Sequence, residues 1–219
     1  MVVYETPFHK EISIGEKTIK PEIISDIPRA SLDRETIGIV LGNPTFWDST
    51  IVGKPSIHEN VKQVREYFHN LFGMSDHDIV PSQYWLFNDG ITSNDFKTVF
   101  DPDMGYIRKK VISSLEYSEK DSLDLMVYFS GEGTTHNGEK VILPYDADST
   151  NSNSFFSVKR LYSNLAHIQA IPEVGNVTLF MDVDFNNPSF TQSIVKQSDI
   201  VENPKKKKKK KKKKKGEPE

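Results

Sequence analysis

The stretch Leu123-Asp-Leu-Met-Val-Tyr-Phe-Ser-Gly-Glu-Gly133 decides the fold of this chain, because an apolar run ends abruptly in a loop of small and polar residues. The first part, from Leu123 to Phe129, predicts a β-strand from its aliphatic and aromatic content. Loops at the ends of buried strands are where binding and catalytic residues gather. Residues 123–133 therefore predict a strand followed by a functional loop.

Apolar runs and helical periods alternate on both sides of this strand. The predicted strands lie at 37–41, 84–87, 123–129 and 177–181. The first of them is continuously apolar, as expected of a strand that is buried on both faces. The predicted helices lie at 57–72, 104–115 and 158–168. Gly73 supplies a C-terminal stop for the first helix, and Asp101-Pro102 supplies an N-cap and first helical position for the second.

Strands that alternate with helices predict an α/β fold, with a mostly parallel sheet and helices on both faces. In such sheets, ligands bind beyond the carboxyl ends of the strands. The candidate site therefore lies in the loops that follow Leu41, Phe129 and Met181.

Composition limits the chemistry of this chain of 219 residues. A hydrophobic content of 36% suits one domain with a substantial core. The sequence contains no cysteine, which excludes disulfides, thiolate metal sites and a cysteine nucleophile. No run approaches 18 apolar residues, and the first residues lack the order of a signal peptide, so we expect a soluble intracellular protein without a transmembrane segment.

Charge is distributed unevenly along the chain. The formal net charge is −3, yet residues 205–219 hold 11 lysines and 2 glutamates, a net +9. Residues 1–204 therefore hold 17 basic and 29 acidic side chains, a net −12. An acidic body repels a phosphate backbone, so we do not expect it to bind nucleic acid by itself.

Several motifs give the chain a family resemblance. Tyr128-Phe129-Ser130-Gly131-Glu132-Gly133 resembles the Tyr-Phe-Ser-Gly-His-Gly stretch of the caspase and metacaspase family of cysteine peptidases, and Asp182-Val183-Asp184 resembles its Asp-x-Cys. The segments 39–43 (Ile-Val-Leu-Gly-Asn) and 141–148 (Val-Ile-Leu-Pro-Tyr-Asp-Ala-Asp) are also similar to family stretches. The resemblance covers about residues 37–186 and implies a caspase-like three-layer sandwich. The chain would lack the last strands of that fold, which form the small-subunit part.

The two departures from the family fall at its catalytic positions. Glu132 stands where the family has its general-base histidine, and Asp184 stands where it has its cysteine nucleophile. A carboxylate is a weak nucleophile toward an amide, and Glu132 is anionic at neutral pH. If the two side chains are neighbours on adjacent strands, their repulsion should raise the pKa of one of them.

These substitutions predict a catalytically inactive caspase-like pseudopeptidase that binds peptides or proteins in a scaffolding or regulatory role. One alternative is a hydrolase in which Glu132 and Asp184 share acid–base work, as the paired carboxylates of aspartic peptidases do. Another is a truncated family fragment without activity. With the last strands missing, the strand that ends at Asp182 would be an open edge. The edge would pair with an active caspase-like relative or a second copy.

Further residues near the strand ends are candidates for binding. The predicted peptide-binding cleft consists of Asn43, Ser130, Gly131, Gly133 and Asp182. We predict no cofactor. A weak calcium site is the one metal hypothesis, because oxygen-rich loops suit this ion. Its candidate ligands are Glu132, His136, Asp182 and Asp184, with Asp146 or Asp148 in addition. For Phe46-Trp47, after the first strand, packing is the first interpretation and partner contact the second.

The chain divides into four predicted segments. Residues 1–36 form a lead with a β-hairpin at 12–19, residues 37–186 form the main domain, 187–204 are weakly structured, and 205–219 form a disordered tail. The run Lys205–Lys215 has three interpretations: an inert expansion, a segment for nuclear import or for binding nucleic acid or anionic membrane, and a linker. We therefore expect a cytoplasmic protein, or a nuclear one through this run. The tail could also fold back on the acidic body, and salt would release it.

Overall fold

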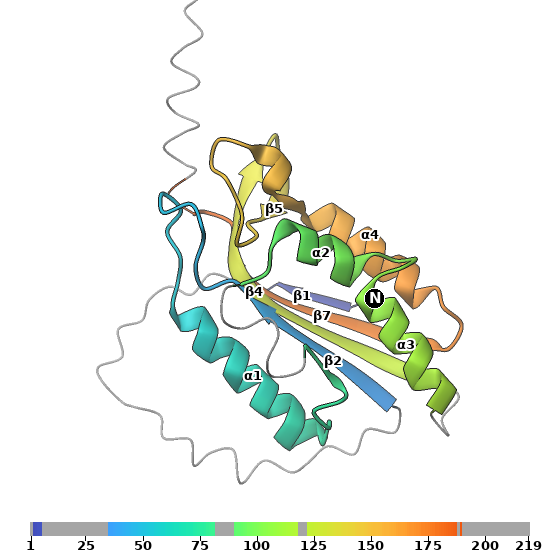
Figure 1. The fold of residues 1–219 in the computed structure, drawn as a ribbon. Helices are drawn as coiled ribbons and strands as arrows, with labels where there is room; N and C mark the ends of the chain where they lie inside the picture. The colour runs from blue at the N-terminus through green and yellow to red at the C-terminus, as the bar shows by residue number, and fades with distance from the viewer. Residues whose placement is uncertain (1, 6–34, 82–89, 118–121, 188, 190–219) are drawn as a thin grey trace, which may run out of the picture.

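The computed structural model describes residues 2–5, 35–81, 90–117, 122–187 and 189 (Figure 1). The strands are β1 (Val2–Glu5), β2 (Glu35–Gly42), β3 (Ile79–Val80), β4 (Leu123–His136), β5 (Glu139–Ile142), β6 (Phe156–Ser157) and β7 (Val174–Asp184). The helices are α1 (Ser56–Phe72), α2 (Ser93–Phe100), α3 (Tyr106–Tyr117) and α4 (Val158–Gln169).

The strands form one curled sheet that mixes parallel and antiparallel pairs. Along the order β1-β7-β4-β2-β3, every neighbouring pair is parallel. The long strand β4 continues beyond this part, and its last residues pair in antiparallel fashion with β5, which in turn pairs with β6. The predicted α/β class is confirmed, and the sheet is mixed.

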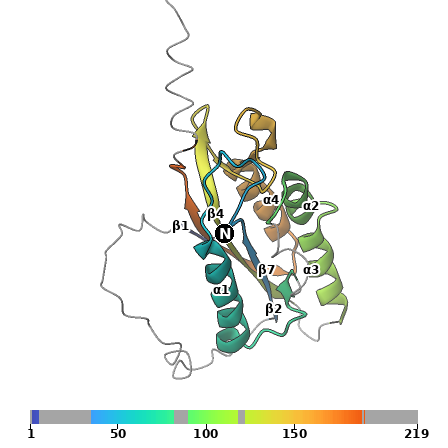
Figure 2. The same ribbon diagram turned by 60° about the vertical axis from the view of Figure 1, so that its left-hand side comes forward.

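Helices cover both faces of the sheet (Figures 1 and 2). On one face, α1 packs Ile57, Val61 and Phe68 against Val40 and Ile79. On the other face, α2, α3 and α4 contribute to the larger core cluster, which also contains alternate residues of β2, β4 and β7. The strand β2 is therefore buried on both faces along residues 37–41, as its continuous apolar run predicted.

Two of the predicted helices are confirmed and one begins elsewhere. The helix α1 ends at Gly73, whose φ of 66° lies in the left-handed region that glycine adopts readily. The predicted N-cap at Asp101 is wrong, because α3 begins at Tyr106 and Asp101 instead follows the end of α2. Met104, which we placed on the apolar face of that helix, is 70% exposed.

The predicted elements did not include α2, nor the short strands β1, β3, β5 and β6. The helix α2 spans eight residues, too few for a clear period, and begins with a capping box formed by Thr92 and Asp95. The strand β1 pairs in parallel with β7, from Val2 beside Thr178 to Glu5 beside Met181. The expectation that β7 is an open edge is therefore corrected, because β1 occupies that side of the strand and is the outermost of the described strands there.

Some predictions lie outside the described residues, namely the hairpin at 12–19, the strand at 84–87, and the tail. A tight turn at Asn137-Gly138, both at positive φ, connects β4 to β5. Within the part of the chain that the structure describes, no helix has the length and hydrophobicity to cross a membrane.

Candidate functional site

The carboxyl ends of β4 and β7 bring the two substituted catalytic positions together. The strands run in register, with Ser130 beside Asp182 and Glu132 beside Asp184. Because side chains alternate along a strand, all four belong to the side of the sheet on which α1 packs. The neighbouring placement of Glu132 and Asp184 thus follows directly from parallel pairing.

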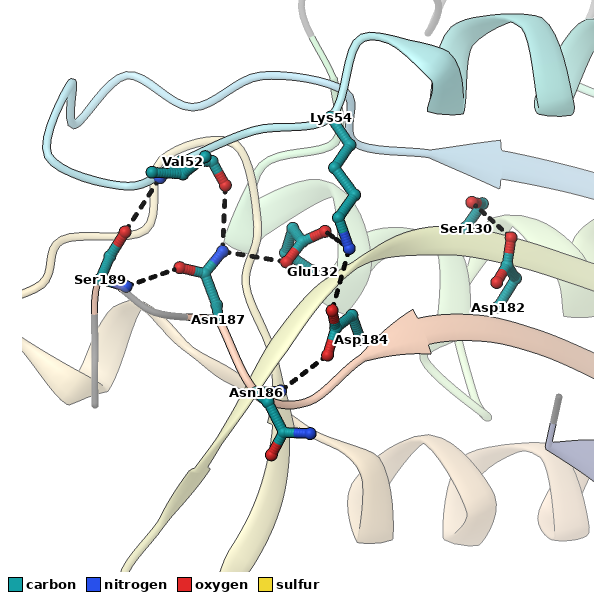
Figure 3. A network of polar contacts seen from close by, with 9 residues as sticks. All are labelled: Val52, Lys54, Ser130, Glu132, Asp182, Asp184, Asn186, Asn187 and Ser189. Carbon is teal, nitrogen blue, oxygen red and sulfur yellow. Dashed lines mark hydrogen bonds and ion pairs between the residues drawn. The ribbon is translucent and has the colours of Figure 1, made fainter. Parts of the chain in front are cut away.

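A lysine from a different part of the chain links the two carboxylates (Figure 3). Lys54 lies in the loop that connects β2 to α1, and its Nζ is 2.9 Å from Glu132 Oε1 and 3.0 Å from Asp184 Oδ2. The side chain of Glu132 is only 2% exposed, whereas those of Lys54 and Asp184 are 48% and 36% exposed. The ammonium of Lys54 thus binds two carboxylates. Of these, Glu132 is shielded from solvent and Asp184 is partly exposed.

Asn187 completes this network from the segment that follows β7. Its Nδ2 donates to Glu132 Oε2 and to the carbonyl oxygen of Val52, at 3.0 Å in each case. Ser189 N donates to Asn187 Oδ1, and Val52 N donates to Ser189 Oγ, again at 3.0 Å. Glu132 therefore joins the loop before α1 to the segment after β7, as Figure 3 shows.

The pKa values of the three ionisable groups in the network are shifted in different directions. Burial raises the pKa of Glu132, and the nearby Lys54 and Asn187 only partly oppose it. Partial burial acts against the charge of Asp184, but the Asn186 N–H and the Lys54 ammonium outweigh it and lower the pKa. Burial likewise opposes the charge of Lys54, and the two carboxylates outweigh it and raise the pKa. One raised carboxyl pKa agrees with the prediction, although burial contributes more than repulsion.

A second pair lies one step earlier along the same two strands. Ser130 Oγ donates to Asp182 Oδ2 at 3.2 Å. Burial raises the pKa of the neighbouring Tyr128 to about 12, with Ser130 opposing the shift and Asp182 adding to it. Ser130 is only 1% exposed, so its hydroxyl contributes to the packing of the strand ends and does not face solvent.

The other predicted cleft residues have buried positions. Asn43 is fully buried, and its Nδ2 donates to the carbonyl oxygens of Ile91 and Leu143, at 3.3 and 3.1 Å, while its Oδ1 accepts from Ile91 N. A Cβ at Gly131 would come within 2.8 Å of the Phe129 ring, and one at Gly133 within 2.6 Å of the Phe185 ring. These three residues therefore shape the backbone at the strand ends.

The candidate metal ligands are dispersed. His136 lies at the far end of β4, where its ring contacts Phe155 and Asn137. Asp146 accepts from Ser93 N and Oγ, and Asp148 accepts from Thr150. Among the residues that the structure describes, no three acidic, histidine or cysteine side chains form a group suited to a metal ion.

Sequence reasoning missed Lys54 and Asn187. Neither residue belongs to a recognisable motif, and Lys54 is 78 positions before Glu132 in the chain. The shared strand ends predicted the two carboxylates, but only a specific loop path places a lysine between them. The one available signal was the need of a buried carboxylate pair for a cation.

Of the two interpretations given for Phe46 and Trp47, packing fits Phe46 but not Trp47. Phe46 packs against a small apolar cluster of Ile51, Leu143 and Ala147. Trp47, the next residue, is 79% exposed. Packing therefore accounts for one aromatic ring, and the other is presented to solvent.

Comparison with known proteins gives no family for this chain. No protein-family model matches its sequence, and no curated protein is significantly similar to it.

Proposed function

We propose that this chain is a caspase-like pseudopeptidase, a protein that binds peptides or other proteins through the carboxyl end of its sheet without cleaving them. The observation that carries the proposal is the bridge from Lys54 to Glu132 and Asp184. The resemblance assigns the general base and the nucleophile to these two positions. Here both side chains are carboxylates bound to one ammonium group, and Glu132 is buried beneath it.

Such a bridge is unsuited to peptide cleavage for three reasons. A carboxylate paired with an ammonium is less nucleophilic than a free one, and the chain has no thiol to take its place. Glu132 contacts Lys54 and Asn187, so its oxygens already have protein partners. A general base must also be within hydrogen-bond reach of the proton it takes, and a side chain 2% exposed does not reach a substrate on the surface.

The first test is digestion of a peptide library by the unmodified chain, with products identified by mass spectrometry in the presence and absence of calcium. We expect no cleavage from folded, monodisperse protein. Cleavage that disappears in Asp184→Ala would contradict the proposal. It would support the hydrolase alternative, which is favoured by the opposite pKa shifts of Glu132 and Asp184.

A second test restores the family's residues. Glu132→His combined with Asp184→Cys introduces the sole thiol of the chain, so a thiol-reactive peptide probe can label only that position. Labelling that depends on the introduced histidine would mean that the strand ends keep a working shape, as a binding module requires. The matched control carries Asp184→Cys alone. Equal labelling of the two variants would favour the inactive-fragment alternative.

Binding itself needs a separate measurement. Peptides selected from a displayed library on the unmodified chain should bind more weakly to Asp184→Ala, whose side chain lies at the proposed surface. Met104→Ala is the matched control, because Met104 is exposed but lies between α2 and α3. Peptides that distinguish neither variant from the original would place binding elsewhere or exclude it.

The proposed protein partner is an active caspase-like relative or a second copy, paired through the sheet edge. Among the described strands, β1 is the outermost on the β7 side of the sheet, where the partner would pair. Light scattering over a concentration series tests self-association, and Val3→Pro, which blocks strand pairing, should abolish it. A constant monomer mass at all concentrations would leave only the heterologous partner.

A further inference from the structure

We propose that the lysine run Lys205–Lys215 docks within the same molecule on the surface formed by residues 43–53 and 143–158, which includes Trp47, Asp48 and Asp148. We call it the Trp47 surface. The inference is independent of the proposed function, because it concerns the chain's own tail and not an external partner. Three observations support it: the hydrogen bonds that hold the surface together, the negative charge of its side chains, and the position of Ser189 beside it.

The two segments of the Trp47 surface are connected by several hydrogen bonds. Trp47 N donates to the carbonyl oxygen of Tyr145 at 2.9 Å, and Ser149 N donates to Asp48 Oδ2 at 3.0 Å. Beneath them, Ile51, Leu143 and Ala147 form a small apolar cluster that also contacts Phe46 and Phe155. A surface that is already ordered loses little conformational freedom when a ligand binds.

The side chains of this surface suit a cationic segment. Trp47 is 79% exposed, and an indole face attracts ammonium groups. Asp48 and Asp148 add two carboxylates, whereas the oxygens of Asp146 accept from Ser93 of α2. Neither segment contains a lysine, arginine or histidine. Hydrogen bonds from Thr50 and Ser149 hold the pKa of Asp48 well below its usual range, so this group stays anionic.

Other faces of the domain are less suited to a polycation. The helix α3 contains Arg108, Lys109 and Lys110 in succession, and α1 contains the exposed Lys62. These basic residues repel additional positive charge at short range, whereas the charged side chains within residues 43–53 and 143–158 are carboxylates. Lys54 directly follows the first segment, and its charge is already paired with Glu132 and Asp184. Charge complementarity therefore selects this surface over the general acidity of the body.

The position of Ser189 places the lysine run near this surface. Ser189 is the last described residue, and its Oγ accepts from Val52 N at 3.0 Å, five positions from Trp47 in the same loop. Fifteen residues, 190–204, connect it to Lys205. A connection of that length spans at most about 50 Å, and about 21 Å on average if unordered. The run is thus held at a high effective concentration beside its target.

Individual ammonium–carboxylate contacts at an exposed surface contribute little, so docking depends on several lysines acting together on one tether. Eleven consecutive lysines make many equivalent registers available. We therefore expect a salt-sensitive association in which Trp47 is contacted by an ammonium group from any of several lysines. An external polyanion, such as nucleic acid, would compete for the same tail.

The experiment uses the full chain labelled with 5-fluorotryptophan and follows Trp47 by fluorine NMR. Its signal is assigned by its loss in Trp47→Phe, which separates it from that of Trp85. The comparison is a chain of equal length in which all eleven tail lysines are replaced by serine. At 20 mM NaCl we expect the Trp47 signal to differ between the two chains, and at 500 mM NaCl we expect the difference to disappear.

Concentration distinguishes docking within one molecule from pairing of two. The signal difference should be the same at 10 and 100 µM protein. A difference that grows with concentration would overturn the proposal in favour of a second copy as the occupant. Identical Trp47 signals in the lysine and serine chains at low salt would also overturn it.

A free eleven-lysine peptide tests the residues of the surface, with the serine-tail chain as its receptor. Trp47→Ala should weaken peptide binding about two- to fivefold, and Asp48→Asn with Asp148→Asn should weaken it further. The matched controls are Met104→Ala and the pair Asp103→Asn with Glu116→Gln, which lie on or near α3. Equal losses in the test and control variants would show that the peptide binds the acidic body without preference, against the proposal.

Discussion

The loop that runs from Asn43 to Lys54 is anchored at its two ends by opposite kinds of chemistry. At the first end, the neutral amide of Asn43 is fully buried and bonds only to backbone groups of Ile91 and Leu143. At the second end, Lys54 binds two carboxylates, of which Glu132 is buried. The same loop is therefore fixed by an uncharged contact on one side and by an ionic network on the other.

Because the two anchors differ in charge, mutations at them should affect the free energy of unfolding differently, and with a different dependence on pH. Removing a buried neutral amide leaves several backbone groups unsatisfied at once, whatever the pH. Removing one member of an ion pair leaves a charge behind, and a carboxyl group can reduce that cost by taking a proton. The Asn43 anchor should therefore be the stronger and the pH-independent one.

The largest expected effect is that of Asn43→Ala. The change leaves Ile91 N–H and the Leu143 carbonyl without the Asn43 side chain, whereas the Ile91 carbonyl keeps its hydrogen bond from Tyr145 N. We expect a loss of about 3 kcal/mol in the free energy of unfolding. Urea denaturation measures it. The control is Asn186→Ala, an exposed asparagine at the site, with an expected change under about 0.5 kcal/mol. Equal losses in the two variants would mean that the hydrogen bonds of the Asn43 side chain do not anchor the loop.

Lys54→Met should have the next largest effect. It keeps the length of the side chain and removes the ammonium, so Glu132 remains buried with Asn187 as its partner. Because Lys54 is half exposed, we expect a loss of about 2 kcal/mol at pH 7, less than for a fully buried pair. Adding Glu132→Gln should recover more than half of that loss in a double-mutant cycle. Strictly additive losses would mean that the pair is not coupled.

The pH dependence separates the two carboxylates of the ionic anchor. The pKa of Glu132 is raised, so its unfolded form ionises first and stability falls as pH rises above about 4.5. Glu132→Gln should therefore gain stability relative to the unmodified chain over that range. The pKa of Asp184 is lowered, so its contribution is present above pH 3.8 and is lost at lower pH. The deficit of Asp184→Asn should shrink as pH falls below 3.8.

Chemical denaturation at a series of pH values measures both trends, and Asn43→Ala is the reference, because its deficit should be the same at every pH. Curves that run parallel for Glu132→Gln and Asp184→Asn would contradict the assignment of opposite shifts to these two groups.

The smallest effect should come from Ser189→Ala. The change removes the acceptor of Val52 N, but Val52 is exposed and its amide can bond to water instead. We expect a loss of about 0.5 kcal/mol, measured by thermal unfolding. Ser113→Ala is the control, because that hydroxyl bonds only to its own helix at Lys110. A loss as large as that of Lys54→Met would mean that the segment after β7 contributes equally to the ionic anchor.

Local sequence patterns predicted the elements that have strong periods. The positions of α1 and α4 and the glycine that ends α1 were predicted, although the buried Arg65 on α1 was not. The helix α2 was missed because eight residues show little more than two turns, and α3 was begun too early because Asp101-Pro102 resembles a helix start. In the structure, the Asp101 carboxylate instead accepts from Asp103 N and Met104 N in a turn before α3.

In the candidate site, too, some residues could be predicted from the sequence and others could not. The positions of Glu132 and Asp184 followed from the strand ends, because the carboxyl ends of neighbouring parallel strands always meet. Their partners did not follow, since Lys54 and Asn187 lie in irregular segments whose paths no short pattern specifies. The pairing of β1 with β7 is similar, because four residues at the start of the chain give no signal of their partner strand.

The sequence by itself determined the α/β class, the strands that carry the site, and the absence of any thiol chemistry, because composition and periodicity are local properties. Only the tertiary structure decided that one lysine links the two carboxylates and that β1 pairs with β7. It likewise decided that Asn43 is buried while Trp47 is exposed. These features depend on contacts between residues far apart in the chain. Such contacts depend on how the sheet and the helices pack, which no local pattern specifies.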